Sequence, residues 1–260
     1  HGEELTTWGR GGKYKAMRFA LRHADQVIAN SEFTRDTLIK MDVKPANITL
    51  IYPGVDVTRF RPDLECKDLR QLAGVTDTGK LILSVGRLSR RKGFDQVIQA
   101  LPALIHAGLD IQYVLIGIGE DYDYLLNLAL KHGVSERVHL LGHVSIDDLP
   151  RWYNACDVFI MPNREINGDT EGFGMVFIEA AACGKPAIAG QTGGTGAAVV
   201  DGVTGFRVDG TDAAAIATAL QRVLEDKQYA QQIGNRALAR AISQFDWSIV
   251  AEKTRQLQTK

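Results

Sequence analysis

The chain has 260 residues, of which 45% are hydrophobic, so it is long enough to bury one large core or two smaller ones. Its 30 lysines and arginines nearly balance 31 acidic residues, and the formal net charge of −1 argues against general nucleic-acid binding, which needs a dominant basic surface. No apolar stretch approaches the length of a membrane span, about 18 residues, and no signal peptide is visible, so we expect a cytoplasmic protein.

The cysteines and histidines do not form a metal-binding pattern. Cys66, Cys156 and Cys183 lack metal-ligand spacing, and the six histidines are scattered along the chain. We therefore expect free, structural thiols in a reducing compartment and no bound metal. The chain begins at His1 and not at a methionine, which indicates a processed or partial chain.

The first sixty residues alternate helix and strand, but they contain too few units for a complete domain. The predicted elements are helices at 13–23 and 32–41 and strands at 26–29 and 48–51. Ser31 is the expected cap of the second helix. Because two strands do not make an independently stable sheet, residues 1–60 are interpreted as the trailing part of an N-terminal α/β domain, with a linker at 52–62.

The first predicted helix carries a basic face. Its basic residues are Arg10, Lys13, Lys15, Arg18 and Arg22. Such a face is typical of contact with anionic lipid, which would make the protein peripheral at the inner face of the membrane. A solvated helix face is the alternative interpretation.

From residue 61 onward, apolar strands alternate regularly with helices. The predicted strands are 81–85, 111–116, 138–141, 157–160, 186–189 and 205–208, and the predicted helices are 94–106, 121–131, 146–155, 173–183, 212–224, 228–242 and 247–257. This alternation indicates an α/β fold with a doubly wound, Rossmann-like parallel sheet, which we assign to residues 61–242. We expect residues 243–260 to form a C-terminal helix that packs back towards the N-terminal domain.

A basic loop bounded by glycines follows the first strand of this sheet. Its sequence is Gly86-Arg-Leu-Ser-Arg-Arg-Lys-Gly93, and it lies at a strand's C-terminal end, where ligands of doubly wound folds bind. Arg87 and Lys92 together could neutralise a diphosphate, because arginine offers a planar fork and lysine a mobile charge. The alternative is an ordinary solvated loop.

Two glutamates, Glu171 and Glu179, flank a glycine turn and the start of the helix predicted at 173–183. At a rise of about 1.5 Å per residue they would lie roughly 12 Å apart, which suits the two ends of an elongated ligand better than acid-base chemistry on one atom. The amides between them would form a helix N-terminus that favours an anion such as a diphosphate. The simpler interpretation is a buried helix with an acidic first turn.

Further glycines follow the next two strands. Gly117 and Gly119 resemble a dinucleotide fingerprint, but the third glycine and the distal acidic residue are absent, so a nicotinamide-dependent oxidoreductase is a weak alternative. We expect Gly117, with His143 and Val144 after the following strand, to bring backbone groups close to a base or ribose. The Thr-Gly-Gly-Thr-Gly loop at 192–196 either cradles sugar or phosphate or is an ordinary turn.

Together these motifs resemble the donor-binding half of retaining glycosyltransferases of family 4, which have the GT-B fold. The resemblance extends from about Ser31 to Phe245 and rests on the basic loop, the two glutamates and the loop at 192–196. The wording Glu-Gly-Phe-Gly-Met-Val-Phe-Ile-Glu-Ala is most similar to the bacterial subgroup that includes phosphatidylinositol-mannoside mannosyltransferases. Ala197 departs from the family pattern, which usually has an acidic residue there.

The resemblance implies a role for each of these residues. Arg87 and Lys92, beside Gly86, would bind the donor diphosphate, while Glu171 would bind hydroxyls of the transferred sugar and Glu179 the ribose. The amides that would contact sugar and phosphates are those of Gly172, Phe173, Gly174, Met175 and Val176. The family's His-Gly element matches His1-Gly2, so the candidate catalytic residues are His1, Arg87, Lys92 and Glu171.

The implied activity is transfer of a mannose-type or glucose-type hexose from a GDP- or UDP-sugar, with retention of the anomeric configuration. The acceptor would be a lipid, a saccharide or a small molecule, and no cofactor would be required. A non-catalytic module that binds nucleotide sugars, or an enzyme lacking its acceptor domain, is the alternative.

Overall fold

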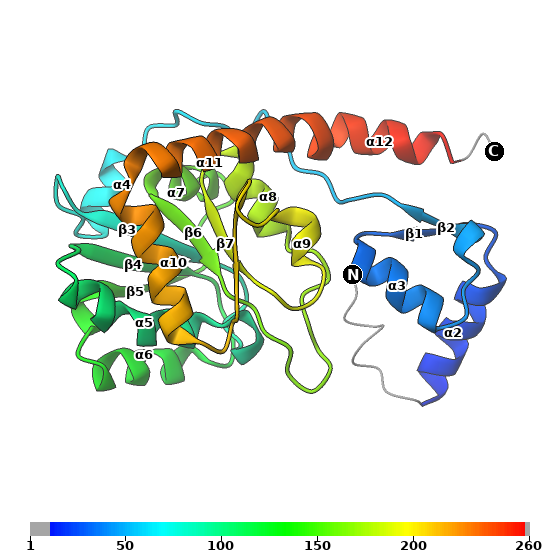
Figure 1. Cartoon of the computed structure of the whole chain (residues 1–260), viewed down its shortest axis with the longest axis horizontal. Coiled ribbons are helices and arrows are strands. Elements are labelled where there is room, and N and C mark those ends of the chain that lie inside the picture. The colour runs from blue at the N-terminus through cyan, green and yellow to red at the C-terminus, as the bar shows by residue number, and fades with distance from the viewer. Residues whose placement is uncertain (1–10, 258–260) are drawn as a thin grey trace.

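A six-stranded parallel sheet forms the centre of the computed structural model, which describes residues 11–257 (Figure 1). Its strands are β3 (Lys80–Val85), β4 (Ile111–Ile116), β5 (Val138–Gly142), β6 (Val158–Met161), β7 (Ala187–Gly190) and β8 (Gly205–Val208). Their order across the sheet is β5-β4-β3-β6-β7-β8, and all neighbours are parallel. The predicted α/β fold with a doubly wound parallel sheet is therefore confirmed.

Two groups of helices cover the two faces of this sheet (Figure 1). One face carries α4 (Lys67–Leu72), α7 (Leu149–Ala155), α8 (Met175–Ala182) and α11 (Lys227–Arg240), and the other carries α5 (Phe94–His106), α6 (Tyr122–Lys131) and α10 (Ala213–Glu225). A short helix, α9 (Thr195–Ala198), follows β7. The sequence did not predict α4 and α9, because six and four residues are too few to show a helical period.

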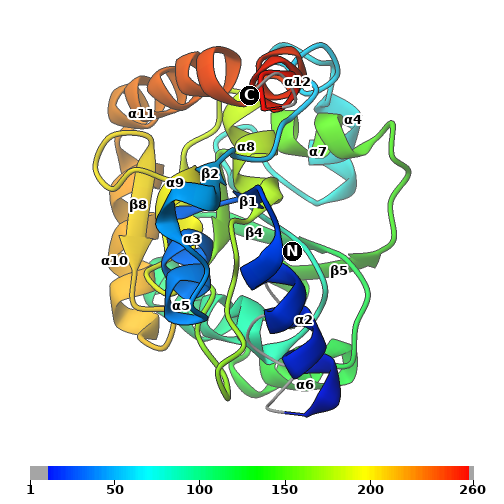
Figure 2. The same ribbon diagram turned by 90° about the vertical axis from the view of Figure 1, so that its right-hand side faces the viewer.

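The N-terminal part of the chain forms a small lobe beside the large sheet. Its elements are α2 (Gly12–His23), β1 (Val27–Ala29), α3 (Glu32–Lys40) and β2 (Ile48–Leu50). β1 and β2 pair in parallel over a small core of their own, and Figure 2 shows α2 and α3 in front of the large sheet. Ser31 caps α3, as predicted, by accepting a hydrogen bond from the Thr34 amide.

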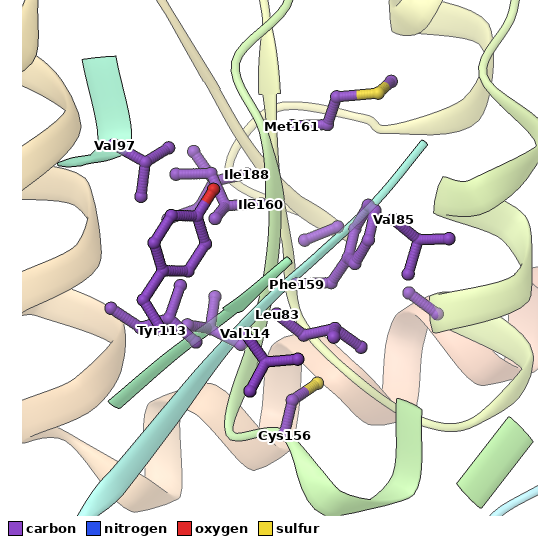
Figure 3. Close-up of a cluster of buried hydrophobic side chains, with 14 of the residues drawn as sticks. Leu83, Val85, Val97, Tyr113, Val114, Cys156, Phe159, Ile160, Met161 and Ile188 are labelled. Carbon is purple, nitrogen blue, oxygen red and sulfur yellow. The ribbon is translucent and has the colours of Figure 1, made fainter. Parts of the chain in front are cut away.

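The core of the large sheet is apolar on both sides of its central strands. Side chains from β3, β4, β6 and β7 meet there with residues of the flanking helices (Figure 3). Tyr113 is fully buried, and its hydroxyl lies 2.9 Å from Ser84 Oγ, so its polar end has a partner. This packing fixes the strand ends from which the functional loops leave.

The C-terminal helices return to the segment that links the lobe to the large sheet. α11 continues into a π-helical stretch, Ala241–Phe245, before α12 (Trp247–Arg255), so regular α-helix ends earlier than the predicted residue 242. Asp246 forms a parallel bridge with Val55. The Trp247 ring lies so close to Gly54 that a Cβ there would come within 2.5 Å of it.

Three further observations concern residues 11–257 as a whole. Cys66 is half-buried and Cys156 and Cys183 are buried, and all three are free thiols. No helix in this range is both long and apolar enough to cross a bilayer. Nor does this range contain three or more His, Cys, Asp or Glu side chains placed so that they could hold a metal ion.

Candidate functional site

Two loops meet where the strand order of the large sheet reverses. The chain moves from β3 outward through β4 to β5, and β6 then begins the other half of the sheet on the opposite side of β3. In open α/β sheets such a reversal leaves a crevice beyond the C-terminal ends of the strands, where ligands bind. The loop after β3 carries Arg87 and Lys92, and the loop after β6 carries Glu171.

Glycines allow the loops after β3 and β4 to pack closely against each other. A Cβ on Gly117 would lie 1.9 Å from the carbonyl oxygen of Gly86, and a Cβ on Gly119 would lie 2.3 Å from that of Leu88. Gly117 also has a φ of +149°, which residues with a side chain rarely adopt. The two glycines therefore allow the backbones of the two loops to lie close together. This packing explains their presence without a dinucleotide fingerprint.

Lys92 and Glu171, 79 residues apart in the sequence, are in direct contact. Lys92 Nζ donates a hydrogen bond to Glu171 Oε2 at 2.6 Å, and Arg91 Nη1 donates to the same oxygen at 3.0 Å. Arg91 Nε also pairs with Asp169 Oδ2 at 3.1 Å, and the four side chains are only 13% to 28% exposed. The sequence did not single out Arg91 or Asp169. The one signal for Arg91 was its position next to Lys92, and Asp169 had none.

The charge state of Glu171 depends on this network. Burial acts to raise the pKa of the Glu171 carboxyl, but the charges and hydrogen bonds of Lys92 and Arg91 outweigh it and lower that pKa below its ordinary value. Glu171 is therefore an anion at neutral pH. Because a lysine ammonium has three donors, Lys92 can bond Glu171 and still offer hydrogen bonds to another anion.

Glu179 lies in a different environment, on the buried side of α8. Its Oε2 accepts a hydrogen bond from the Tyr153 hydroxyl at 2.7 Å, a partner that the sequence did not indicate. Burial raises the pKa of Glu179, and the hydrogen bond from Tyr153 opposes this only in part. The two glutamates thus have different partners and opposite pKa shifts, which is consistent with contact to different parts of one ligand.

A cavity of about 880 Å³ opens at the C-terminal ends of β3, β4 and β5. Five predicted binding residues line it, namely Gly86, Arg87, Gly117, His143 and Val144. The cavity also has apolar walls that the sequence did not single out, formed by Ile118, Ile146 and Leu149. Its size and mainly apolar lining are those of a small-molecule site.

Arg87 and Glu120 connect this cavity to the network around Glu171. Arg87 Nε lies 3.2 Å from Glu120 Oε2, and both residues line the 880 Å³ cavity as well as a second cavity of about 390 Å³. Arg91 and Asp169 line the second cavity too. The predicted diphosphate-binding arginine therefore stands between the apolar cavity and the charged network.

Helix α8 begins two residues later than predicted. The helix begins at Met175 and not at Phe173, because Gly174 adopts a left-handed conformation with a φ of +87°. Gly172, Phe173 and Gly174 form a buried turn, while Met175 and Val176 supply the first amides of the helix, which have no intrahelical partner. His1, which the resemblance suggested as catalytic, lies outside the described residues.

The loop after β7 supports the backbone beside Glu171. The Gly194 amide donates to the carbonyl oxygen of Glu171 at 2.7 Å, and a Cβ on Gly193 would lie 2.2 Å from the same oxygen. Asn163 Nδ2 in turn donates to the carbonyl oxygen of Thr192 at 3.0 Å. The Thr-Gly-Gly sequence therefore permits close packing that holds the glutamate turn.

Curated proteins of similar sequence are named as glycosyltransferases. The chain is 35% identical over 235 residues to a GDP-mannose-dependent alpha-(1-6)-phosphatidylinositol monomannoside mannosyltransferase of Mycolicibacterium smegmatis, covering 89% of this chain and 61% of that protein. A D-inositol 3-phosphate glycosyltransferase of Corynebacterium diphtheriae is 32% identical, with coverage of 89% and 55%. The chain thus spans less than two thirds of the length of these curated relatives.

Solved structures and family models agree as well. A crystal structure of Anabaena HepE in complex with UDP and glucose matches with a TM-score of 0.85 and 28% identity, covering 95% of this chain and 66% of that one. The model described as Glycosyltransferase Family 4 matches residues 1–59, which confirms the predicted resemblance to family 4 enzymes with the GT-B fold. The model described as Glycosyl transferases group 1 matches residues 67–240, more than half of the chain, and the chain therefore belongs to that family.

Proposed function

We propose that the chain carries the donor-binding part of a retaining hexosyltransferase that uses a nucleotide-diphosphate sugar. The contact between Lys92 and Glu171 at the strand-order reversal carries the proposal. It brings a cation suited to phosphate to within 2.6 Å of a carboxylate suited to sugar hydroxyls, and the apolar cavity that Arg87 lines is large enough for a nucleoside.

In this proposal the donor extends along the crevice. The base and ribose occupy the cavity lined by Gly117, His143 and Val144, with Glu179 binding the ribose. The diphosphate lies between Arg87 and Lys92, close to the first amides of α8, and Glu171 binds hydroxyls of the sugar. The apolar cavity, the cationic pair and the carboxylate then follow one another in the order base, diphosphate, sugar.

The cations would act on the leaving group. Negative charge grows on the diphosphate as the glycosidic bond breaks, so preorganised donors there stabilise the transition state, by about 3 kcal/mol for one group. The acceptor hydroxyl would attack from the same face that the diphosphate leaves, with a phosphate oxygen assisting its deprotonation. This route retains the anomeric configuration and needs neither an enzyme nucleophile nor a cofactor.

The relatives indicate which substrates to test first. The mycobacterial relative is named for GDP-mannose and a phosphatidylinositol monomannoside, and the Anabaena structure contains UDP and glucose. We therefore infer a mannose or glucose donor, and a lipid, a saccharide or an inositol-containing small molecule as acceptor. Residues 61–242 would be the donor domain, residues 1–60 the end of the acceptor domain with its linker, and residues 243–260 a C-terminal segment whose helix α12 starts beside that linker at Gly54.

Calorimetric titration of the chain with GDP, UDP, GDP-mannose and UDP-glucose tests the proposal. We expect one base to be bound, and Lys92→Met to weaken that binding by about 10- to 100-fold, because a hydrogen bond to a charged group is lost. Lys131→Met, which changes an exposed lysine at the end of α6, is the control and should bind normally. The proposal fails if none of the four compounds binds.

An activity assay distinguishes a transferase from a non-catalytic binding module. Sugar transfer or donor hydrolysis by the chain, lost in Lys92→Met, would support a transferase. Tight binding of a nucleotide sugar with neither reaction would favour the alternative, a non-catalytic nucleotide-sugar-binding module.

A further inference from the structure

We propose that Ser31 is a positioning residue for the donor sugar, which it serves by holding the turn that carries Glu171. Ser31 belongs to the N-terminal lobe and is fully buried, yet its Oγ donates a hydrogen bond at 2.7 Å to the carbonyl oxygen of Gly172, 141 residues away. The inference rests on the proposed donor site, because it assigns Ser31 a role in presenting Glu171 to the sugar.

The hydrogen bonds around Ser31 direct its proton to Gly172. As the cap of α3, Ser31 Oγ accepts from the Thr34 amide at 3.1 Å, so its single proton remains to be donated. The Thr34 hydroxyl donates its own proton to Asn30 Oδ1 at 2.6 Å. Ser31 Oγ then has two acceptors within reach, the Gly172 carbonyl at 2.7 Å and Thr34 Oγ1 at 3.1 Å, and the contact with Gly172 is the shorter of the two.

The contact is tight because a glycine lies against it. A Cβ on Gly194 would lie 1.9 Å from the Gly172 carbonyl oxygen and 2.6 Å from Ser31 Oγ. Three backbone segments, from the lobe, the glutamate turn and the loop after β7, therefore converge at one point. A side chain at position 194 would therefore disrupt the contact between Ser31 and Gly172.

Successive residues of the turn are held by different parts of the chain. The Glu171 carbonyl accepts from the Gly194 amide, the Gly172 carbonyl accepts from Ser31, and the Phe173 ring stacks on Tyr52 with centroids 5.9 Å apart. Since glycine resists rotation of its backbone less than any other residue, Gly172 is the member of this series that most needs an external partner. Without the Ser31 hydroxyl, the peptide between Gly172 and Phe173 could reorient, and the turn that presents the Glu171 carboxylate to the sugar would shift with it.

Paired titrations with nucleotides and nucleotide sugars test the role. Ser31→Ala and Ser31→Gly should weaken binding of UDP-glucose or GDP-mannose by about tenfold, while binding of UDP and GDP stays within about twofold, because Glu171 serves the sugar. Glycine caps helices almost as well as serine, so Ser31→Gly should fold and can be measured even if Ser31→Ala does not fold. Thr34→Val is the matched control, because it removes a hydroxyl from the same cap and leaves the contact with Gly172 in place.

The outcomes distinguish the two proposals. Equal loss of nucleotide and nucleotide-sugar affinity, or no loss relative to Thr34→Val, would overturn the role of Ser31, even if Lys92→Met weakens binding as expected and the donor site stands. Failure of the unaltered chain to bind any of the four compounds would remove both proposals. A selective loss for the sugar-bearing compounds in both Ser31 variants supports the positioning role.

Discussion

A buried ion pair ties the segment that carries Glu171 to helix α5. Arg164 Nη2 donates to Asp95 Oδ2 at 2.8 Å, and the two side chains are only 13% and 5% exposed. The Arg164 amide also donates to the carbonyl oxygen of Arg91 at 2.9 Å. The pair therefore joins the loop after β6, the basic loop after β3 and the first turn of α5 at a single point.

Arg164→Met should destabilise the fold strongly, because it leaves the Asp95 carboxylate buried and unpaired. Asp95 Oδ1 already lacks a hydrogen-bond partner among the described residues, so Arg164 supplies the main compensation for the buried charge. Breaking a buried pair in this way costs about 3 to 5 kcal/mol. For a chain of this size the loss corresponds to a fall in melting temperature of about 6 to 20 °C.

Calorimetric or denaturant unfolding of four proteins measures this effect: the unaltered chain, Arg164→Met, Asp95→Asn with Arg164→Met, and Arg255→Met. The double variant should recover much of the lost stability, since it removes both charges. Arg255→Met breaks an exposed pair with Glu252, 74% and 47% exposed, and should cost no more than about 1 kcal/mol. The reasoning is refuted if Arg164→Met and the double variant lose the same stability, or if Arg164→Met loses no more than Arg255→Met.

Two further predictions concern Glu179 and the thiols. Because burial raises the pKa of Glu179, the folded state holds its proton more tightly, and stability is lost as pH rises from about 4 through the folded pKa. Glu179→Gln should therefore raise the melting temperature more at pH 8 than at pH 4, and an equal change at both would contradict the shift. Burial raises the pKa of all three thiols, that of Cys156 to about 12, but Cys66 is only half-buried while Cys156 and Cys183 are buried, so N-ethylmaleimide should label Cys66 first in the native chain at pH 8. Peptide mapping that finds Cys156 or Cys183 labelled before Cys66 would refute this.

The elements that the sequence predicted best are those with long, uninterrupted patterns. The helix at 94–106 and the strand at 111–116 have the predicted bounds, because a thirteen-residue amphipathic pattern and a six-residue, mainly apolar run are long enough to be recognised. The start of α8 was misplaced by two residues, since the left-handed conformation of Gly174 is not visible in an apolar periodicity. The π-helical stretch after α11, Ala241–Phe245, likewise has no signature in the apolar periodicity.

The site was predictable only in part, because several of its contacts join residues that are far apart in the sequence. Lys92 and Glu171 stand in motifs that can be recognised, but Arg91, the second cation bound to Glu171, looked like one more charge in a basic loop. Tyr153 is 26 residues from Glu179, and Ser31 is 141 residues from Gly172, where it looked only like a helix cap. Such contacts exist only once the strand order of the sheet has brought the loops together, so no window of sequence contains them.

The charged network also explains why Lys92 is more informative than Arg87 as a test of the site. Arg87 pairs with Glu120 on the surface, where the side chains are 68% and 57% exposed, so that pair contributes little. Lys92 is 13% exposed and is one of the two cations that offset the burial of Glu171. Its loss would remove a charge from the proposed diphosphate site and would leave Arg91 alone to offset the burial of Glu171, so the pKa of Glu171 would rise. A carboxyl that carries a proton accepts fewer hydrogen bonds from sugar hydroxyls, so in the proposed site the same lysine supports both the leaving diphosphate and the transferred sugar.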